Sequence, residues 1–248
     1  MAMRLPPPSQ KADYVRQKFD EIAGRYDRFN DLITLGRHRG WKKQLVRALE
    51  LKPGASGADL CCGTGDITLR LLEALAPGGG RVVALDFSPE MLRVAGERLR
   101  QKAPRGSAAT PVLLRGDAMR LPFPDGSLDF VTIGYGLRNV SDLPECLREI
   151  ARVLAPGGRL GCLDVGKVEP PWLRPPADFY LFQVVPRIGA LLQPGQEMYA
   201  YLPASTVDYP GQVALQGLME EAGFSPVKIT NFLFGAAALH VATKPEQR

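Results

Sequence analysis

The sequence has little of what a membrane-spanning, secreted or disulfide-bonded protein needs. Its 248 residues contain no uninterrupted apolar run of the roughly 18–20 residues that cross a bilayer. The N-terminal segment MAMRLPPPSQ lacks the apolar core of a signal peptide, so residues 1–10 are expected to form a proline-stiffened, flexible tail. Only four cysteines occur, without paired spacing, which favours reduced thiols in a cytoplasmic protein over a disulfide framework.

Acidic residues are scarce in the N-terminal part of the chain. The first fifty residues hold 11 of the 31 Lys and Arg but 6 of the 26 Asp and Glu, so the net charge of +5 lies there. The segment Arg37–Arg47, RHRGWKKQLVR, has no acid and places Trp41 among the bases. A solvated helix face would explain this segment, and so would peripheral contact with anionic lipid headgroups at the membrane surface. We expect no nucleic acid partner, because a pI of 9.1 alone is weak evidence for one.

Short apolar segments alternate with helical patterns from residue 55 onward. Strands are predicted at 55–61, 81–86, 110–117, 127–135 and 159–166, with helices between them, and two further strands at 225–234 and 235–244. This alternation predicts an α/β fold with a doubly wound, mostly parallel, seven-stranded sheet. Residues 11–27 show helical spacing and a second helix is predicted at 41–49, so residues 11–50 are expected to form an N-terminal helical cap. Residues 51–248 then form one domain, with the proline-rich and aromatic segment 167–205 as a lid or insert.

The segment CCGTGD lies at the end of the first predicted strand, at the edge of a parallel sheet where ligands bind. Gly63 and Gly65 allow a sharp turn, and Asp86 at the end of the next strand suits a pair of ribose hydroxyls. A dinucleotide fingerprint would have a third glycine where Thr68 stands. Carboxylates are expected around this edge at Asp59, Asp66, Asp86 and Asp117. Because Asp66 would repel a pyrophosphate, the pattern favours the cationic, phosphate-free S-adenosylmethionine over NAD or FAD.

The adjacent Cys61 and Cys62 are interpreted as packing residues. As neighbours in a strand, their side chains would point to opposite faces and would not hold one metal ion together. Cys146 and Cys162 are expected on a helix and a strand, without the spacing of a zinc site. We therefore predict no metal centre.

Several longer segments resemble the ubiquinone/menaquinone biosynthesis C-methyltransferases. They are KFDEIAGRYDRFNDLITLGRHRGWKK, DLCCGTGD, LPFPDGSLDFVTIGYGLRNVSD, EIARVLAPGGRL and YLPASTVDYPGQVALQGLMEEAGF. The resemblance implies a Rossmann-like class I methyltransferase that transfers a methyl group from S-adenosylmethionine to a ring carbon of a prenylated quinol. Cys61 and Cys62 stand where enterobacterial-type members tend to have Ala-Gly. Demethylmenaquinol, demethylphylloquinol and a benzoquinol all stay open as the acceptor.

The resemblance also implies roles for individual residues. Cofactor contacts are implied at Gly63, Thr64, Gly65, Asp86, Asp117, Ala118 and Gly134, to which the strand-end pattern adds Asp59. Arg138 is expected to stabilise a phenolate, and Asn139 to orient a hydroxyl or a water. Tyr26 and His38 come from the expected cap, and His38 is the natural base by its pKa, or else a surface histidine. The apolar stretch Phe179–Leu192 is expected to line a channel for the prenyl tail.

Two other functions stay open at this point. The chain would also suit a methyltransferase for another small acceptor, such as a soluble phenol or a sterol. A non-catalytic module that binds the cofactor or a lipid within a biosynthetic assembly is the third reading. Gly63, Gly65, Asp86 and Arg138 are all present, which argues against a dead site. The oligomeric state is open as well, with a homodimer among the expected forms.

Overall fold

The computed structural model describes residues 8–104, 109–192 and 198–246. One sheet holds the strands β1 (Ser56–Leu60), β2 (Gly80–Asp86), β3 (Ala109–Arg115), β4 (Leu128–Gly134), β5 (Leu154–Val165), β6 (Val227–Phe232) and β7 (Ala237–Thr243). Their order is β3-β2-β1-β4-β5-β7-β6. β7 runs antiparallel to its neighbours β5 and β6, and the other pairs are parallel. The predicted seven-stranded, mostly parallel sheet is confirmed.

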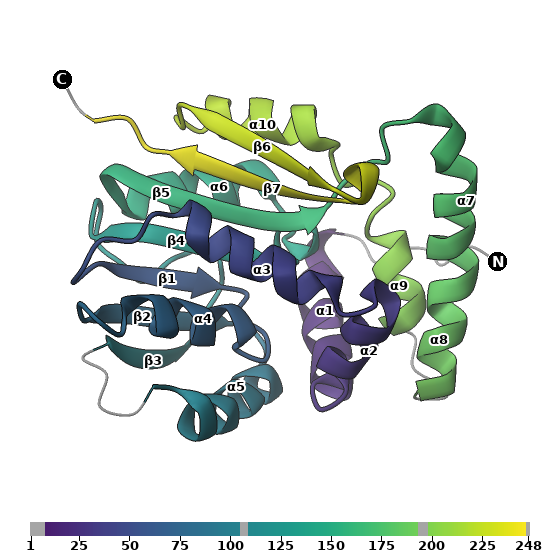
Figure 1. Ribbon diagram of the computed structural model, residues 1–248, viewed down its shortest axis with the longest axis horizontal. Coiled ribbons are helices and arrows are strands. Elements are labelled where there is room, and N and C mark those ends of the chain that lie inside the picture. Colours follow the sequence, from purple (N-terminus) through teal and green to yellow (C-terminus); the bar gives the residue numbers. More distant parts are fainter. Residues whose placement is uncertain (1–7, 105–108, 193–197, 247–248) are drawn as a thin grey trace.

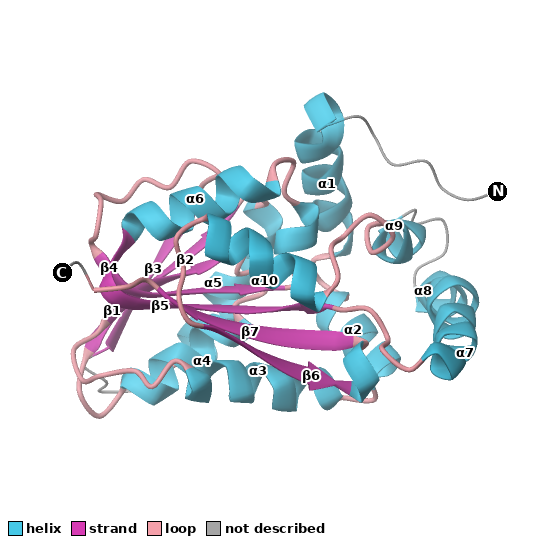
Figure 2. Ribbon diagram, turned by 90° about the horizontal axis from the view of Figure 1, so that it is seen from above, coloured by secondary structure: helices cyan, strands magenta, loops and turns pink. Residues whose placement is uncertain are grey.

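Helices cover both faces of the sheet and one end of it (Figures 1 and 2). They are α1 (Pro8–Ile22), α2 (Tyr26–Thr34), α3 (Arg37–Ala48), α4 (Asp66–Leu75), α5 (Pro89–Lys102), α6 (Leu143–Val153), α7 (Arg174–Phe179), α8 (Val185–Leu192), α9 (Met198–Ala204) and α10 (Gln212–Glu221). Shorter helical turns are η1 (Leu137–Asn139), η2 (Pro171–Leu173), η3 (Tyr180–Val184) and η4 (Leu233–Gly235). Within the described residues, no helix is both long enough and apolar enough to cross a bilayer.

Each face of the sheet has its own apolar core. On one face, α6 and α10 bury Leu147, Ile150 and Leu215 against β1, β4 and β5. On the other face, α3 packs on β5 and β7, and α4 and α5 pack on β2 and β3, with Leu45 and Leu71 fully buried. A central strand buried on both faces reads as a continuous apolar run, which is why these strands were recognisable in the sequence.

The N-terminal helices α1 and α2 lie beyond the carboxyl ends of the parallel strands (Figure 1). They form a third apolar cluster with α8 and α9, in which Phe29 is fully buried and its ring centroid lies 4.6 Å from that of Tyr199. The sequence predicted one helix over 11–27, but the structure ends α1 at Ile22 and begins α2 at Tyr26. This helical cap, together with the insert helices α7–α9, closes the end of the sheet where a ligand would bind.

A buried carboxylate ties the first strand to its neighbours. Asp59 of β1 is fully buried and accepts hydrogen bonds from the hydroxyls of Thr68 in α4, at 2.6 Å, and Thr132 in β4, at 2.7 Å. Burial raises the pKa of Asp59 to about 6, although the two hydroxyl donors oppose the rise. The side chain therefore holds β1, β4 and α4 together from inside the core.

Replacing Asp59 by Asn should change how stability depends on pH. Because the folded protein holds the Asp59 proton more tightly than the unfolded chain, this stabilising contribution is present below the unfolded pKa and is lost as the pH rises through about 6. The stability of the wild type relative to Asp59→Asn should therefore fall by about 2–3 kcal/mol between pH 4 and pH 7. Urea denaturation at several pH values measures this difference. Parallel pH profiles for the two proteins would contradict the assignment.

Candidate functional site

The turn between β1 and α4 carries the glycine-rich segment CCGTGD. Gly63 and Gly65 both have a left-handed backbone, with φ of 54° and 77°. A Cβ on Gly65 would lie 3.1 Å from the Cβ of Ala95 in α5, whereas a Cβ on Gly63 would meet nothing within 4 Å. Gly65 therefore allows α4 to pack closely on α5, and Gly63 leaves open space at the turn for a ligand.

The carboxylate of Asp86, at the end of β2, holds this turn in place. It accepts hydrogen bonds from the backbone N–H groups of Gly63, at 2.7 Å, and Ser88, at 2.9 Å. Burial raises the pKa of Asp86, and the backbone donors oppose that rise. A buried acceptor at the end of the second strand is suited to the hydroxyl groups of a ribose.

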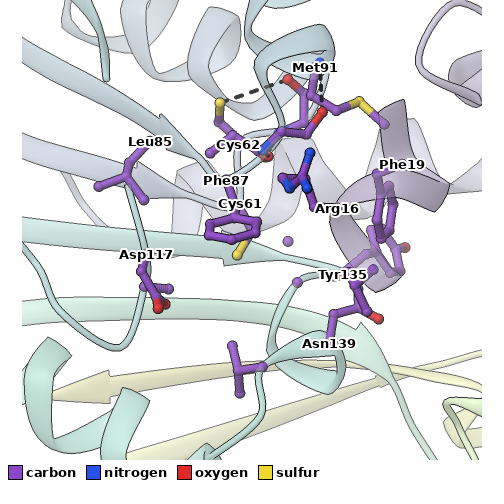
Figure 3. A pocket seen from close by; sticks show the side chains of 18 of the residues that line it. Arg16, Phe19, Cys61, Cys62, Leu85, Phe87, Met91, Asp117, Tyr135 and Asn139 are labelled. Atoms are coloured by element: carbon purple, nitrogen blue, oxygen red, sulfur yellow. Dashed lines mark hydrogen bonds between the residues drawn. The ribbon is translucent and has the colours of Figure 1, made fainter. Parts of the chain in front are cut away.

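A cavity opens beside the turn, at the carboxyl ends of the parallel strands. Its empty volume is about 1040 Å³, including the solvent at its mouth. Figure 3 shows Phe87, Cys61 and Asp117 on the strand side of this first cavity, with Arg16 and Phe19 of α1 across from them. The predicted site residues that line it are Gly63, Thr64, Asp86, Asp117, Ala118, Gly134, Tyr26 and Asn139. The open space, the ribose acceptor and the apolar walls fit an adenosyl cofactor.

Two residues predicted to contact a cofactor do not line the cavity. The side chain of Asp59 points from β1 to Thr68 of α4, because alternate residues of a strand face opposite sides of the sheet. Gly65 packs against α5 behind the turn. Both residues pack behind the turn, on the side away from the cavity. Their predicted direct contact with a cofactor is therefore not supported by this geometry.

The net negative charge beside the first cavity is smaller than the sequence predicts, because one of its carboxylates is paired with cations. Asp66 forms ion pairs with Lys42 of α3, at 3.0 Å, and with Arg70, at 3.4 Å. Burial acts to raise the pKa of Asp66, but the two cations outweigh it and the pKa is lowered. The negative charge of Asp66 is therefore compensated, which removes the basis for its expected repulsion of a pyrophosphate.

The hydroxyl of Thr64 contacts the helical cap. Its Oγ1 donates a hydrogen bond to Asp27 of α2 at 2.8 Å. Arg98 of α5 contacts both the Thr64 hydroxyl and the Asp27 carboxylate. The glycine-rich turn, α2 and α5 are thus joined by one polar cluster at the rim of the first cavity.

Cys61 and Cys62 pack within the turn. With φ of 51°, Cys61 has already left β1, so the turn, and not strand alternation, sets the directions of the two side chains. Burial raises the pKa of both thiols well above its usual range, which disfavours thiolate chemistry. Across the described parts of the chain, no three His, Cys, Asp or Glu side chains come together as a metal site.

A second cavity, with an empty volume of about 1890 Å³ including solvent at its mouth, lies on the other side of Tyr135. Its walls come from α2, α3, the end of β5, the insert helices and the turn between β6 and β7. Apolar side chains predominate among them: Ile33, Trp41, Val165, Leu181, Phe182, Val185, Leu202 and Leu233. Tyr180, Leu181, Phe182 and Val185 belong to the stretch Phe179–Leu192 that was expected to line a channel.

Arg138 lines this second cavity and is 8% exposed. Its guanidinium forms a buried ion pair with Asp164 at the end of β5, and its backbone N–H lies 3.3 Å from the same carboxylate. Burial opposes the charge of Arg138, but Asp164 outweighs it and raises the pKa of Arg138. The Nε of Arg138 is buried without a hydrogen-bond partner among the described residues. The sequence predicted that this charge stabilises a phenolate, and the structure adds a carboxylate that compensates it and one unused donor.

His38 also faces the second cavity and is buried, which excludes the surface histidine considered from the sequence. Its Nε2 lies 2.9 Å from Asp31 Oδ1. Burial lowers the pKa of His38 despite the opposing effect of Asp31, so the ring is neutral at neutral pH. A neutral imidazole oriented by a carboxylate is suited to accept a proton.

Asn139 and Tyr26 lie on the side of the first cavity. Asn139 donates from Nδ2 to the carbonyl oxygen of Tyr135, at 3.2 Å, and accepts from the hydroxyl of Tyr201, at 3.2 Å. Burial raises the pKa of Tyr26, so this side chain remains a neutral phenol. The four residues predicted to be catalytic are thus divided between two neighbouring cavities.

Sequence reasoning missed Lys42, Asp164 and Tyr135. Asp164 had a recognisable signal, because it lies near the end of a predicted strand in LDVG, much as Asp86 ends one in ALDF. Lys42 was one of several bases in a charged segment, and no local pattern separates it from its neighbours. Tyr135 was included in a predicted strand, but it lies just beyond the end of β4 with φ of 59°.

Comparison with protein families and curated proteins places these features in context. The model of the ubiE/COQ5 methyltransferase family matches residues 8–244. The demethylmenaquinone methyltransferase of Leptospira interrogans is 45% identical over 251 residues, covering 99% of this chain and 98% of that protein. Proteins of the same name from Lactiplantibacillus plantarum and Bacillus cereus are 44% and 38% identical, over 93% and 96% of this chain and 95% and 98% of their own lengths.

Solved structures show the same fold at low sequence identity. A SAM-dependent methyltransferase from Aquifex aeolicus has a TM-score of 0.61 and 19% identity, over 88% of this chain and 97% of that chain. A possible histamine N-methyltransferase from Thermotoga maritima has a TM-score of 0.64 and 20% identity, over 92% and 99%. These likenesses confirm the Rossmann-like methyltransferase fold.

Replacing Asp86 should weaken cofactor binding. Asp86→Ala removes the proposed acceptor for the ribose hydroxyls and should lower the affinity for S-adenosylhomocysteine by about 1.5–3 kcal/mol. Asp86→Asn keeps one acceptor oxygen for the turn and should lose less. Isothermal titration calorimetry measures the affinities, with Glu97→Ala on the exposed face of α5 as the control. Unchanged affinity in a folded Asp86→Ala protein would exclude this contact.

Proposed function

Because the chain belongs to the ubiE/COQ5 methyltransferase family, we propose that it methylates a ring carbon of demethylmenaquinol, with S-adenosylmethionine as the donor. The names of its relatives support this acceptor. The single observation that carries the proposal is the pair of neighbouring cavities that share Tyr135. One cavity suits a polar adenosyl cofactor, and the other, lined by apolar side chains, suits a fused ring with a prenyl tail.

The residues of the first cavity would hold the cofactor. Asp86 would accept hydrogen bonds from the ribose hydroxyls, Asp117 and Ala118 would contact the adenine, and the space at Gly63 would admit the methionine portion. When bound, S-adenosylmethionine supplies an electrophilic methyl group on a sulfonium. Aligning this methyl with the acceptor carbon, at roughly 3–3.5 Å, is the main task of the protein.

On the acceptor side, the ring must be reduced, because an oxidised quinone has no nucleophilic carbon. The unpartnered Nε of Arg138 donates to a ring oxygen, and Asp164 holds the guanidinium in place. When the ring carbon gains the methyl group it must lose its proton, and His38, kept neutral by burial and oriented by Asp31, would accept that proton. Asn139 and Tyr26 line the first cavity, and Asn139 is hydrogen-bonded to Tyr135, which lies between the two cavities.

A methylation assay tests the proposal directly. The protein is incubated with methyl-labelled S-adenosylmethionine and with reduced demethylmenaquinone, its phytyl-tailed counterpart, a prenyl benzoquinol, a soluble phenol and a sterol. We expect label in the reduced naphthoquinol and none in its oxidised form. Transfer to the phenol or the sterol alone would overturn the proposal, and so would a bound cofactor without any transfer.

Changes at Arg138 should lower turnover without changing cofactor affinity. Arg138→Leu removes the proposed donor to the ring oxygen and should reduce kcat by about 10²–10³-fold. It also leaves Asp164 buried and unpaired, which by itself should cost about 3–5 kcal/mol of stability. The double variant Arg138→Leu/Asp164→Leu removes that cost and separates the two effects.

Arg138→Lys keeps the charge without the planar fork and should recover only part of the rate. Steady-state rates and urea denaturation are measured for all three variants. Near-normal turnover in the double variant would remove Arg138 from the mechanism.

We further propose that the mouth of the second cavity lies on the membrane surface. Phe182 and Leu233 line this cavity and are 40% and 42% exposed. Close to lining residues in the sequence, Phe234 follows Leu233 and is 64% exposed, and Trp172 lies two positions before Arg174 and is 74% exposed.

Trp41, expected to be an interfacial residue, instead stacks on Phe232 with ring centroids 5.4 Å apart. This stacking joins α3, with its exposed bases Arg37 and Lys43, to β6, which η4 follows directly. Apolar side chains flanked by bases suit an anionic lipid surface, from which a prenylated acceptor would enter.

Removing the apolar side chains at this mouth should weaken membrane binding. The double variant Trp172→Ser/Phe234→Ser should bind vesicles of phosphatidylglycerol and phosphatidylcholine at least about tenfold less tightly, because burying an aromatic side chain stabilises by about 1.5–3 kcal/mol. Val112→Ser, on the edge strand β3 at the opposite end of the sheet, is the control. Vesicle co-sedimentation measures the binding. Equal binding by all three proteins would contradict this orientation.

A further inference from the structure

Tyr135 is the one residue, among those that the structure describes, that lines both cavities. It follows β4 directly and precedes the short turn η1 that carries Arg138. Figure 3 shows it beside Asn139 at the boundary of the first cavity. Any acceptor carbon that reaches a methyl group in the first cavity from the second must therefore pass or contact this side chain.

The backbone holds Tyr135 in an unfavourable conformation. Its φ of 59° lies in the left-handed region, which costs a residue with a side chain of this size free energy. The glycines on both sides permit the tight path. A Cβ on Gly134 would lie 2.3 Å from Ile67 Cδ1, and a Cβ on Gly136 would lie 2.4 Å from the Cβ of Cys61.

Further contacts fix the residue in this place. The backbone N–H of Tyr135 donates to the carbonyl oxygen of Leu163 at 2.7 Å, and its own carbonyl accepts from Asn139. The guanidinium carbon of Arg138 lies 5.6 Å from the centre of its ring. The hydroxyl, by contrast, is buried without a hydrogen-bond partner within the described residues. The ring is thus firmly placed, while the hydroxyl contributes no hydrogen bond.

We propose that the ring of Tyr135 is the partition between the donor and acceptor sites and determines which acceptor ring can reach the methyl group. This inference rests on the proposed function, since it assigns the two cavities to donor and acceptor. A methyl transfer requires the two reacting atoms within roughly 3–3.5 Å, so a fixed aromatic wall at the boundary sets the approach of the acceptor. Tyr135 is in this account a specificity-determining residue, and its ring rather than its hydroxyl performs the task.

Three variants separate the ring, the hydroxyl and general packing. Tyr135→Gly removes the ring and suits the left-handed backbone, so the fold should persist. Tyr135→Phe keeps the ring and removes only the unpartnered hydroxyl. Tyr209→Phe is the control, because the Tyr209 hydroxyl is also buried, against the thiol of Cys162, but Tyr209 lines neither cavity.

The first readout is acceptor preference, measured as the ratio of kcat/KM for a prenylated naphthoquinol to that for a prenylated benzoquinol. Tyr135→Gly should change this ratio by at least about tenfold, the scale on which pocket shape discriminates between ring sizes. Tyr135→Phe and Tyr209→Phe should keep the ratio within about threefold of the wild type. A large change in Tyr135→Phe would assign the task to the hydroxyl and overturn the proposal.

The second readout is binding. The affinity for S-adenosylhomocysteine is measured by calorimetry with and without a prenylated 1,4-naphthoquinone. Because the two ligands share Tyr135 as a wall, the naphthoquinone should change the affinity for S-adenosylhomocysteine by about fivefold or more in the wild type. In Tyr135→Gly this change in affinity should disappear. Coupling and acceptor preference that are both unchanged in Tyr135→Gly would overturn the inference. If the wild type methylates neither quinol, the proposed function fails, and the coupling alone decides on Tyr135.

Discussion

Three buried carboxylates at the carboxyl ends of the strands hold the site together, because a carboxylate removed from water must be hydrogen-bonded by the protein. Asp59 accepts from hydroxyls of α4 and β4, and Asp86 accepts from backbone N–H groups of two turns. Asp164, near the end of β5, forms an ion pair with Arg138, which follows the neighbouring strand β4. Each of the three carboxylates makes at least one contact with a residue 23 or more positions away in the sequence. The shapes of both cavities therefore depend on polar groups at the strand ends as well as on the apolar core.

The helical cap completes both cavities through two kinds of contact. Toward the sheet it is bound by polar groups: Asp27 accepts from Thr64, and Lys11 donates to the carbonyl oxygen of Val140 at 2.7 Å. Toward the insert it is bound by apolar packing, in which Phe29 contacts Tyr199. Because α2 carries Tyr26 at the first cavity and Ile33 at the second, the cap contributes to each cavity. A protein that must bring a polar donor to an apolar acceptor needs such an element between the two.

Local signals accounted for the parts of the structure that were predicted well. The apolar strands, the glycine-rich turn and Asp86 are each encoded within a few residues, and all lie where the sequence indicated. The division between α1 and α2 was missed because apolar residues continue at helical spacing across Gly24 and Arg25. The first strand was predicted one residue too long at its end, since nothing local shows that Cys61 adopts a left-handed conformation.

The sequence by itself determined the fold class and the edge of the sheet at which ligands bind, because strand periodicity and glycine turns are local properties of the chain. Only the tertiary structure decided which charged side chains form ion pairs. Lys42 neutralises Asp66 across 24 positions of sequence, and Asp164 neutralises Arg138 across 26. It also divided the predicted catalytic residues between two cavities and placed Tyr135 at their boundary. Such pairings depend on distances across packed elements, and the free energy of a charge depends on its surroundings, neither of which a periodic pattern contains.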